Sequence, residues 1–474
     1  MRICIISREY PPDSGWGGIA TYSYHQAHGL VALGHEVEVI SLAAAGAASH
    51  SAEPTIEDGI KVHRVKWQGL LDSVPMIKDS TPFSQYVLKS IFALTKKFLE
   101  VHAKNPFDVA EAPEHLAEGL GIALTRALPL VVRLHTPQSK FIAEKFHNVT
   151  ATFDQQLVAI MERYAMLFSD AITSPSEDMA DFVAGDINYP RNEMHVIRNP
   201  VDSEKFSPDG DKALSADGKL TVLFVGRLEA RKGIHYLVEA VPQVVKNCPQ
   251  VQFVIIGSDT NNAAGQGSVL HELKESLGKN GCAAHVVFIP HVPLADIPRY
   301  YRSADICVVP SLYDNAPCTC LEAMSSGKAV IGTSSGGTPE YVLHEKCGLI
   351  IKAKDSPALA GAIIDLAKNE SKRLHMGAAG RQRVLENYTP QTIAKQSLDV
   401  YQLAIQEYKT SKVRALIPAQ SLHMFDQDNE LLSAYNQMLY NFLYLQSWDF
   451  RAKHRLKRAG SLVATLGRKT SSSK

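Results

Sequence analysis

The stretch LTVLFVGRLEARKGI, residues 220–234, combines the signals that decide the fold. Its apolar, β-branched start is typical of a buried strand, and the glycines that follow mark a turn into an amphipathic helix. The turn carries Arg227 and Lys232 beside the helix N-terminus, where unpaired N–H groups and the helix dipole favour an anion. Two cations at such a point predict a diphosphate clamp, although a solvated basic turn explains the same residues.

Short apolar runs alternate with amphipathic stretches on both sides of this segment. Before it, we expect a helix at Ile19–Leu33 and strands at Ile3–Ser7, Glu36–Ser41, Pro129–Leu134 and Ala171–Ser174. After the strand Leu220–Val225 and the helix Ile234–Asn247, we expect Gln252–Ile256, His285–Ile289, Asp305–Val309, Ala329–Gly332 and a helix at Leu359–Lys368. Strands that alternate with helices predict parallel sheets covered on both faces, which is the α/β class.

A polar stretch rich in turn formers interrupts this alternation at 204–219, where we place a linker. It separates two expected Rossmann-like domains, 1–203 and 220–387. Ligands of such sheets bind at the carboxyl ends of the strands, so two facing domains enclose a cleft for two substrates. A Thr-Pro pair then starts a helix at 388–410 that does not continue the second series.

Composition excludes several classes of protein. Lys plus Arg and Asp plus Glu number 49 each, so the chain has no overall field for a polyanion, and nucleic acid is not an expected partner. The seven cysteines are scattered in mostly apolar runs, which is typical of reduced thiols. No stretch reaches the ~20 apolar residues that span a bilayer, and the N-terminus lacks a signal-peptide core. We therefore expect a cytoplasmic protein.

The end of the chain differs from the rest. Residues 411–474 form a C-terminal extension, and its last part, 451–474, contains eight Lys or Arg and no acid. A solvated tail is the simplest interpretation. The interspersed apolar residues also fit a basic amphipathic helix in peripheral contact with an anionic membrane, and nucleic-acid binding is a third reading.

Glycines and carboxylates mark two further segments. Gly15, Gly17 and Gly18 stand between the first expected strand and helix, where they let the backbone approach a phosphate, although a plain tight turn accounts for them equally well. Asp314 and Glu322 follow a later strand and can accept hydrogen bonds from sugar and ribose hydroxyls. A carboxylate pair at this spacing is common by chance.

Taken in order, these motifs resemble the retaining GT-B glycosyltransferases of family 4, whose hallmark is Glu, seven residues, Glu. The matching segments are DNAPCTCLEAM from Asp314, GKAVIGT from Gly327, GGTPE from Gly336, VGRL followed by KG from Val225, VIRNPVD from Val196 and YTP from Tyr388. The resemblance covers roughly the first 410 residues. It implies transfer of a hexose-type sugar from a nucleotide-sugar donor to a glycan, lipid-linked or small-molecule acceptor, with retention of configuration, no metal and no cofactor.

The resemblance also implies a role for each matching residue. The implied catalytic residues are His135, Asp314 and Glu322, and the implied donor-binding residues are Gly17, Gly18, Arg227, Lys232, Asp314 and Glu322. Arg227 and Lys232 would hold the diphosphate, Glu322 the ribose and Asp314 the donor sugar. His135, in RLHTP after a strand, matches the family's cleft histidine, although a lone histidine at a strand end is more often structural.

Two departures from the family pattern bear on substrate and activity. Asp314 stands in place of the first Glu, which shortens the reach to the sugar by one methylene, and Ala316-Pro317 stands where many relatives have Phe-Gly. Pro317 offers no N–H to a ligand. Three rivals stay open: a GT-B epimerase or phosphorylase, a catalytically inactive GT-B scaffold, for which Asp314 is the only hint, and a nucleic-acid binder acting through the tail.

Overall fold

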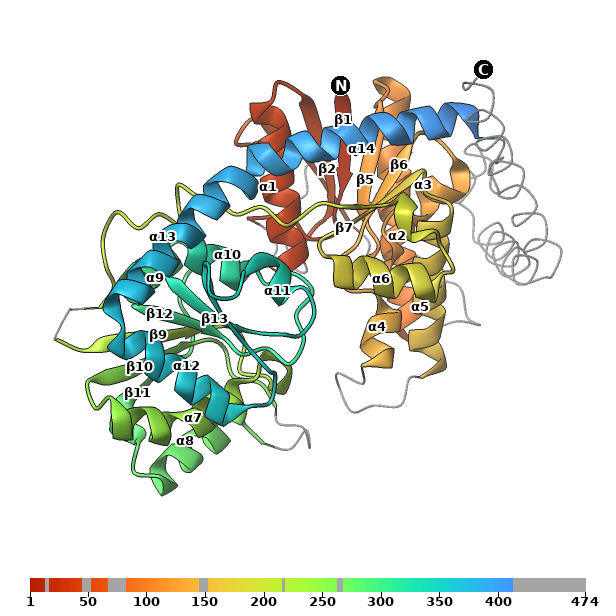
Figure 1. The fold of residues 1–474 in the computed structure, drawn as a ribbon. Helices are drawn as coiled ribbons and strands as arrows, with labels where there is room; N and C mark the ends of the chain where they lie inside the picture. The colour runs from red at the N-terminus through yellow and green to blue at the C-terminus, as the bar shows by residue number, and fades with distance from the viewer. Residues whose placement is uncertain are drawn as a thin grey trace, which may run out of the picture.

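The computed structural model describes residues 1–12, 17–44, 53–66, 82–144, 152–214, 218–261 and 267–411. These residues form two separate sheets, each covered by helices on both faces (Figure 1). All paired strands run parallel except one pair at an outer edge. The predicted α/β class with two Rossmann-like units is confirmed.

The first sheet has eight strands in the order β3-β4-β2-β1-β5-β6-β7-β8. Its strands are β1 (Arg2–Ile6), β2 (Glu36–Leu42), β3 (Thr55–Glu57), β4 (Ile60–Val65), β5 (Val109–Pro113), β6 (Leu130–Arg133), β7 (Ala171–Ser174) and β8 (Met194–Val196). Its helices are α1 (Gly18–Ala32), α2 (Pro82–Lys104), α3 (Leu120–Thr125), α4 (Gln138–Ala143), α5 (Phe153–Leu167) and α6 (Glu177–Asp186). The strand order reverses direction at β1 and β5, and such a switch point leaves a crevice at the carboxyl ends of the strands.

The second sheet has six strands in the order β11-β10-β9-β12-β13-β14. Its strands are β9 (Leu220–Val225), β10 (Val251–Ile256), β11 (Val286–Ile289), β12 (Ile306–Val309), β13 (Ala329–Thr333) and β14 (Gly348–Ile351). The helices after β9 are α7 (Ile234–Asn247), α8 (Val269–Lys279), α9 (Ile297–Ser303), α10 (Cys318–Ser325), α11 (Thr338–Tyr341), α12 (Ser356–Lys368), α13 (Glu370–Asn387) and α14 (Pro390–Thr410). Here the switch point lies between β9 and β12.

Alternation along β1 shows how the first core is divided. Ile3 and Ile5 pack with residues of α1 and α14, whereas Cys4 and Ile6 pack on the other face with α2, α3 and α5. Successive side chains of a strand point to opposite faces, so an unbroken apolar run is the pattern of a strand buried on both sides. The apolar stripe of α2 is likewise buried, as a core helix requires.

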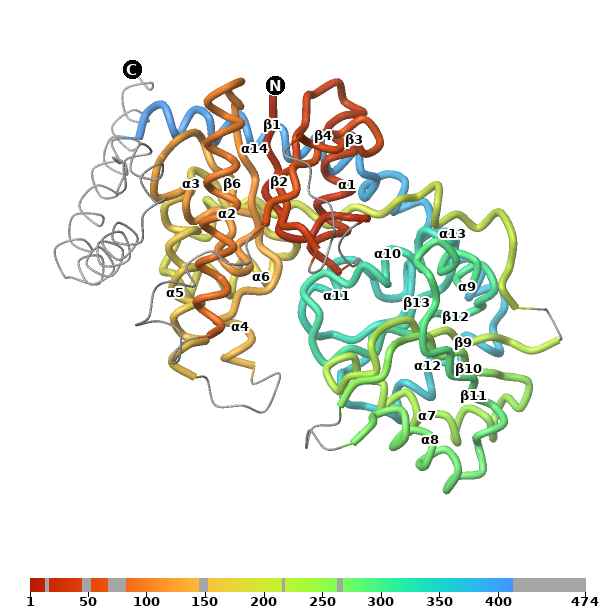
Figure 2. Tube along the Cα trace, turned by 180° about the vertical axis from the view of Figure 1, so that it is seen from behind, coloured from red at the N-terminus to blue at the C-terminus, as the bar shows by residue number. Residues whose placement is uncertain are grey.

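Helix α14 leaves the second sheet and lies across α1 and the first sheet (Figures 1 and 2). The hydroxyl of Thr389 accepts a hydrogen bond from the N–H of Thr392, and Pro390 is the first helical residue. Close approach to α1 depends on Gly29, because a Cβ there would lie 2.3 Å from the carbonyl oxygen of Pro390. Helix α14 thus covers part of the core of the first domain.

Several predicted boundaries shift by one or two residues. β11 begins at Val286, because Ala283–His285 form a 3-10 turn before it. Among the described residues between β8 and β9 there is no regular element. We keep 204–219 as a proposed linker, with domains at 1–203 and 220–387, a crossing helix at 388–410 and an extension from 411.

No described helix combines the length and hydropathy needed to cross a bilayer. The predicted membrane contact of 451–474 lies outside the described residues.

Candidate active site

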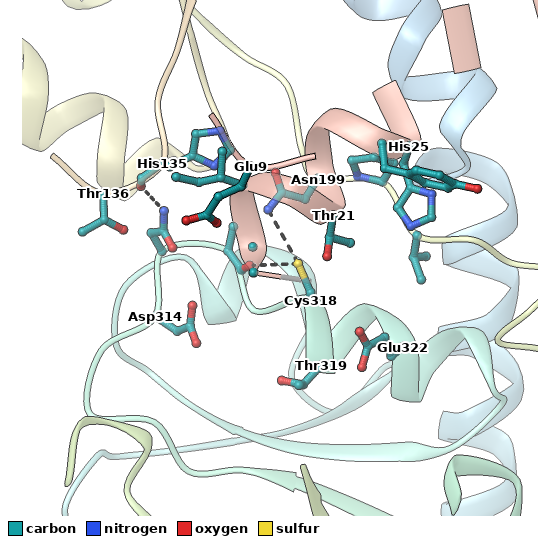
Figure 3. A pocket seen from close by; sticks show the side chains of 18 of the residues that line it. Glu9, Thr21, His25, His135, Thr136, Asn199, Asp314, Cys318, Thr319 and Glu322 are labelled. Atoms are coloured by element: carbon teal, nitrogen blue, oxygen red, sulfur yellow. Dashed lines mark hydrogen bonds between the residues drawn. The ribbon is translucent and has the colours of Figure 1, made fainter. Parts of the chain in front are cut away.

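A pocket of about 820 Å³ lies between the carboxyl ends of the two sheets. Side chains of the first domain line one wall and side chains of the second domain line the other (Figure 3). The structure brings together, as lining residues of this one pocket, all of the site residues predicted from the sequence: Gly17, Gly18, His135, Arg227, Lys232, Asp314 and Glu322. Gly15 lies outside the described residues.

The turn after β9 is built around a glycine. Gly233 has a φ of +70°, and a Cβ there would lie 1.9 Å from the carbonyl oxygen of Pro310, so no other residue fits without a shift of the backbone. This turn carries Arg227 and Lys232, which line the second domain's side of the pocket. The side chain of Arg227 is 62% exposed and that of Lys232 only 23%, so the lysine sits deeper. Arg231, which the sequence analysis did not single out, also lines the pocket.

Lys232 and Asp314 form an ion pair in the pocket wall. The Nζ of Lys232 donates to Oδ2 of Asp314 at 2.6 Å. Burial raises the pKa of Asp314, but the charges of Lys232 and Arg231 outweigh it, so this pKa lies below its usual value. The carboxylate is therefore ionised at neutral pH and can accept hydrogen bonds.

Glu322 lies on α10, and Asp314 lies in the loop that precedes this helix (Figure 3). Tyr301 donates its hydroxyl to Oε2 of Glu322 at 2.7 Å. Burial raises the pKa of this carboxyl, and the hydrogen bond from Tyr301 offsets part of that rise. Its other oxygen is the group that could meet a ligand hydroxyl.

The glycine loop reaches the pocket at the start of α1. Gly17 is the N-cap of this helix, and no side chain caps its first turn. A Cβ on Gly17 would lie 3.3 Å from Oε2 of Glu9, so a carboxylate stands beside the predicted phosphate loop. Arg8 pairs with that carboxylate at 2.7 Å and reduces its charge toward the pocket.

His135 follows β6 and lies in the first wall (Figure 3). Its main-chain N–H donates to Oε2 of Glu114 at 2.7 Å, and its ring meets the ring of Tyr22 edge-on at 5.4 Å. Burial, with the charge of Arg133 adding to it, holds the pKa of His135 well below its usual value. The imidazole is therefore neutral and can donate one hydrogen bond and accept another.

Sequence reasoning missed the buried link between the two walls. Arg133 donates to the carbonyl of Ile197 at 2.7 Å and to Oδ1 of Asn199 at 2.8 Å. Nδ2 of Asn199 in turn contacts Sγ of Cys318 at 3.9 Å (Figure 3). The motif VIRNPVD pointed to this segment, but nothing local in the sequence says that a buried arginine would hold its asparagine.

Comparison with known proteins identifies both halves of the chain. Residues 16–205 match the family model Glycosyltransferase Family 4, and residues 208–383 match Glycosyl transferases group 1. Spore coat protein SA of Bacillus subtilis is 31% identical over 420 residues, which cover 85% of this chain and 99% of that protein. Glycogen synthase of Mycobacterium tuberculosis is 25% identical over 412 residues, which cover 85% and 94%.

Solved structures share the architecture. Sucrose-phosphate synthase from Thermosynechococcus elongatus superposes with a TM-score of 0.68 at 24% identity, covering 86% of this chain and all of that one. HepE from Anabaena in complex with UDP gives a TM-score of 0.62 at 19% identity, covering 85% of this chain and all of HepE. With two matched family models and the fold of these neighbours, the chain belongs to the GT-B glycosyltransferases of group 1, family 4, and is a glycosyltransferase.

Proposed function

We propose that this glycosyltransferase moves a hexose-type sugar from a nucleoside-diphosphate donor to a hydroxyl acceptor, with retention of configuration and without a metal. The Lys232–Asp314 pair, facing neutral His135 across one pocket, is the observation that carries the proposal. The solved structures of HepE with UDP and with UDP-glucose support a nucleotide-sugar donor. Retention rests on the resemblance of the segment from Asp314 to Glu322 to the family hallmark.

The donor side needs positive charge more than covalent chemistry. As the bond between the sugar carbon and the diphosphate breaks, negative charge grows on the leaving oxygen. Arg227 and Lys232 can stabilise that charge directly, which is the reason to expect no metal. Asp314 accepts hydrogen bonds from sugar hydroxyls and Glu322 from ribose hydroxyls.

The acceptor side needs a group that orients a hydroxyl without adding charge. Neutral His135 can accept or donate one hydrogen bond close to the sugar. The acceptor oxygen then bonds to the sugar carbon as the bond from that carbon to the diphosphate breaks, and the hydroxyl proton passes to the departing diphosphate oxygen. Holding both reactants in one narrow pocket accounts for much of the rate, because it replaces a bimolecular encounter. A glycan, a lipid-linked sugar or a small polyol would each supply such a hydroxyl.

Thermal shift and donor hydrolysis against UDP-, GDP- and ADP-sugars, with EDTA present, test the proposal. We expect one nucleotide class to raise the melting temperature of the wild-type chain. Lys232→Ala and Glu322→Ala should each weaken that nucleotide's binding roughly 10- to 100-fold, since a hydrogen bond to a charged group contributes about 1.5–3 kcal/mol. Asp314→Ala should impair hydrolysis more than nucleotide binding.

Lys279→Ala is the matched control, because this exposed lysine pairs within α8, with Glu275 at 2.7 Å, and does not line the pocket. It should bind nucleotide like the wild type. If none of the three nucleotide classes stabilises the wild-type chain, the inactive-scaffold interpretation replaces this one. If EDTA alone abolishes binding or hydrolysis, the metal-independent part of the proposal is wrong.

A further inference from the structure

The two residues that flank Asp314 both reach across the pocket to the other domain. On one side, the hydroxyl of Tyr313 donates to Oδ2 of Asp178 at 2.7 Å. On the other side, Nδ2 of Asn315 donates to the main-chain carbonyl of His135. The short loop that carries the proposed sugar-binding carboxylate is therefore tied to the first domain at both ends. We call Tyr313 and Asn315 the cross-cleft clasp.

The main chain of His135 is held from both domains. Its N–H donates to Glu114 of its own domain at 2.7 Å, and its carbonyl accepts from Asn315 of the opposite domain. Glu114 is buried and Asn315 is partly buried, and a residue whose two main-chain polar groups are both bonded to such side chains has little freedom to shift. The position of the imidazole therefore depends in part on where the second domain lies.

The loop of Asp314 is also held from behind. Gly337 donates its N–H to the carbonyl of Asp314 at 2.9 Å. A Cβ on Gly337 would lie 2.0 Å from the carbonyl oxygen of Asn315 and 2.8 Å from the Cβ of Ser176 in the first domain. The loop therefore packs closely against Gly337 at the domain interface, and a shift of the second domain carries Asp314 with it.

Neighbouring contacts show that this junction is broad. The carboxylate of Glu340 accepts the N–H of Glu177 at 2.8 Å and that of Asp178 at 3.1 Å, at the start of α6. The hydroxyl of Tyr341 donates to the carbonyl of Pro175 at 2.8 Å. These bonds remain when one clasp side chain is removed, so a single substitution should misalign the site rather than unfold the chain, whereas loss of both clasp bonds should loosen the junction.

We propose that Asn315 is a positioning residue that couples the approach of the two domains to the alignment of Asp314 with His135. The inference deepens the proposed function and rests on it. Lys232 pairs with Asp314 and is proposed to hold the donor diphosphate. Both residues belong to the second domain, so donor binding does not need the clasp. Turnover does, because the acceptor-side histidine and the donor-side carboxylate come from different domains.

The test compares donor binding and turnover in three variants of the full chain. Asn315→Ala removes the amide, Asn315→Asp keeps its shape but places a carboxylate oxygen against the His135 carbonyl, and Tyr313→Phe removes the bond to Asp178. We expect nucleotide Kd and donor KM to stay within about threefold of wild type, while kcat falls about 10- to 100-fold in both Asn315 variants and less in Tyr313→Phe. Asn280→Ala, whose side-chain amide donates to the carbonyl of Ser276 in an exposed position, is the matched control.

Small-angle X-ray scattering without ligand supplies a readout that does not depend on the donor. The double variant Tyr313→Phe/Asn315→Ala should have a larger radius of gyration than wild type. Unchanged kcat in both Asn315 variants, a loss of nucleotide binding equal to the loss of kcat, or an unchanged radius of gyration in the double variant would each overturn the inference. Failure of the wild-type chain to bind any nucleotide sugar would instead overturn the proposed function.

Discussion

The Lys232–Asp314 pair on one wall of the pocket and the histidines on the other wall are in opposite states of ionisation. In the second domain, Lys232 lies 2.6 Å from Asp314, and with Arg231 it holds the pKa of that carboxyl below its usual value against the effect of burial. In the first domain, burial lowers the pKa of His25 and of His115 to about 4 and holds that of His135 well below its usual value. The wall of the second domain, which we propose binds the donor and call the donor wall, therefore carries an ionised carboxylate at neutral pH. The histidines of the first domain's wall, which we propose faces the acceptor and call the acceptor wall, are neutral.

This difference fits the two halves of the proposed reaction. A diphosphate brings its own charge and can share the cation of an existing pair, so an ionic wall is already arranged to receive it. An attacking hydroxyl brings no charge, and a neutral imidazole can orient it without attracting the diphosphate. Glu322 is the exception on the donor wall, since burial raises its pKa.

The largest expected effect comes from breaking the donor wall at Gly233. Gly233→Ala adds a Cβ that would lie 1.9 Å from the carbonyl oxygen of Pro310, at a φ of +70°. Strained backbone and overpacking together should cost roughly 3 kcal/mol and displace the turn that carries Lys232. Urea unfolding should show the lost stability, and nucleotide thermal shift should show lost binding.

Gly361→Ala is the matched control for that variant. Gly361 is an exposed residue inside α12, and a Cβ there would meet no atom within 4 Å. The substitution should leave nucleotide binding unchanged and stabilise the chain by about 0.5–1 kcal/mol. A Gly233→Ala variant as stable as wild type would contradict the steric account of the donor wall.

Local signals explain which elements could be predicted. β9 and the turn after it form one continuous pattern of apolar run, glycines and helix, so residues 220–234 were sufficient. β5 reads VAEAP, and its Glu111 and Pro113 interrupt the apolar run that would mark a strand. Glu111 is buried there because Tyr401, far along the chain, donates to it. No window around β5 contains that information.

The same limit applies to the site. Arg227, Lys232, Asp314 and Glu322 follow strand ends of one domain, so their spacing already placed them at one edge of a sheet. The contact of Asn315 with the first domain depends on which group the other domain brings to it. A sequence pattern records the residue but not its distant partner.

An intermediate effect on stability is expected at Tyr401, where α14 packs on the first domain. Its hydroxyl donates to Oε2 of Glu111 and accepts from Nε2 of Gln26, both at 2.9 Å, in the buried contact of α14 with the first domain. Tyr401→Phe leaves two buried polar groups without this partner, which should cost about 2 kcal/mol of unfolding free energy. Urea unfolding at pH 7 measures it.

Tyr300→Phe is the control for that change, because the Tyr300 hydroxyl makes no hydrogen bond to a described residue, and the variant should unfold like the wild type. A Tyr401→Phe variant as stable as Tyr300→Phe would show that the buried carboxyl does not depend on the helix that covers it. Nucleotide binding should be unchanged in both, since neither hydroxyl faces the donor wall.

The smallest effect concerns the unfolding free energy that the chain loses in acid because of buried His115. Burial, aided by the charge of Arg8, holds the pKa of His115 at about 4, whereas an unfolded chain protonates this ring near pH ~6.5. As pH falls from about 6.5 toward 4, the unfolded state therefore takes up the proton first, and the folded state loses stability.

His115→Gln removes that proton uptake. Between pH 7.5 and 5, urea unfolding should show the variant losing about 1–2 kcal/mol less than wild type, while His291→Gln, at an exposed position, should lose as much as wild type. Equal acid losses in the wild type and in His115→Gln would mean that this imidazole is not held neutral by the fold, and the contrast between the two walls would then rest on His25 and His135 alone.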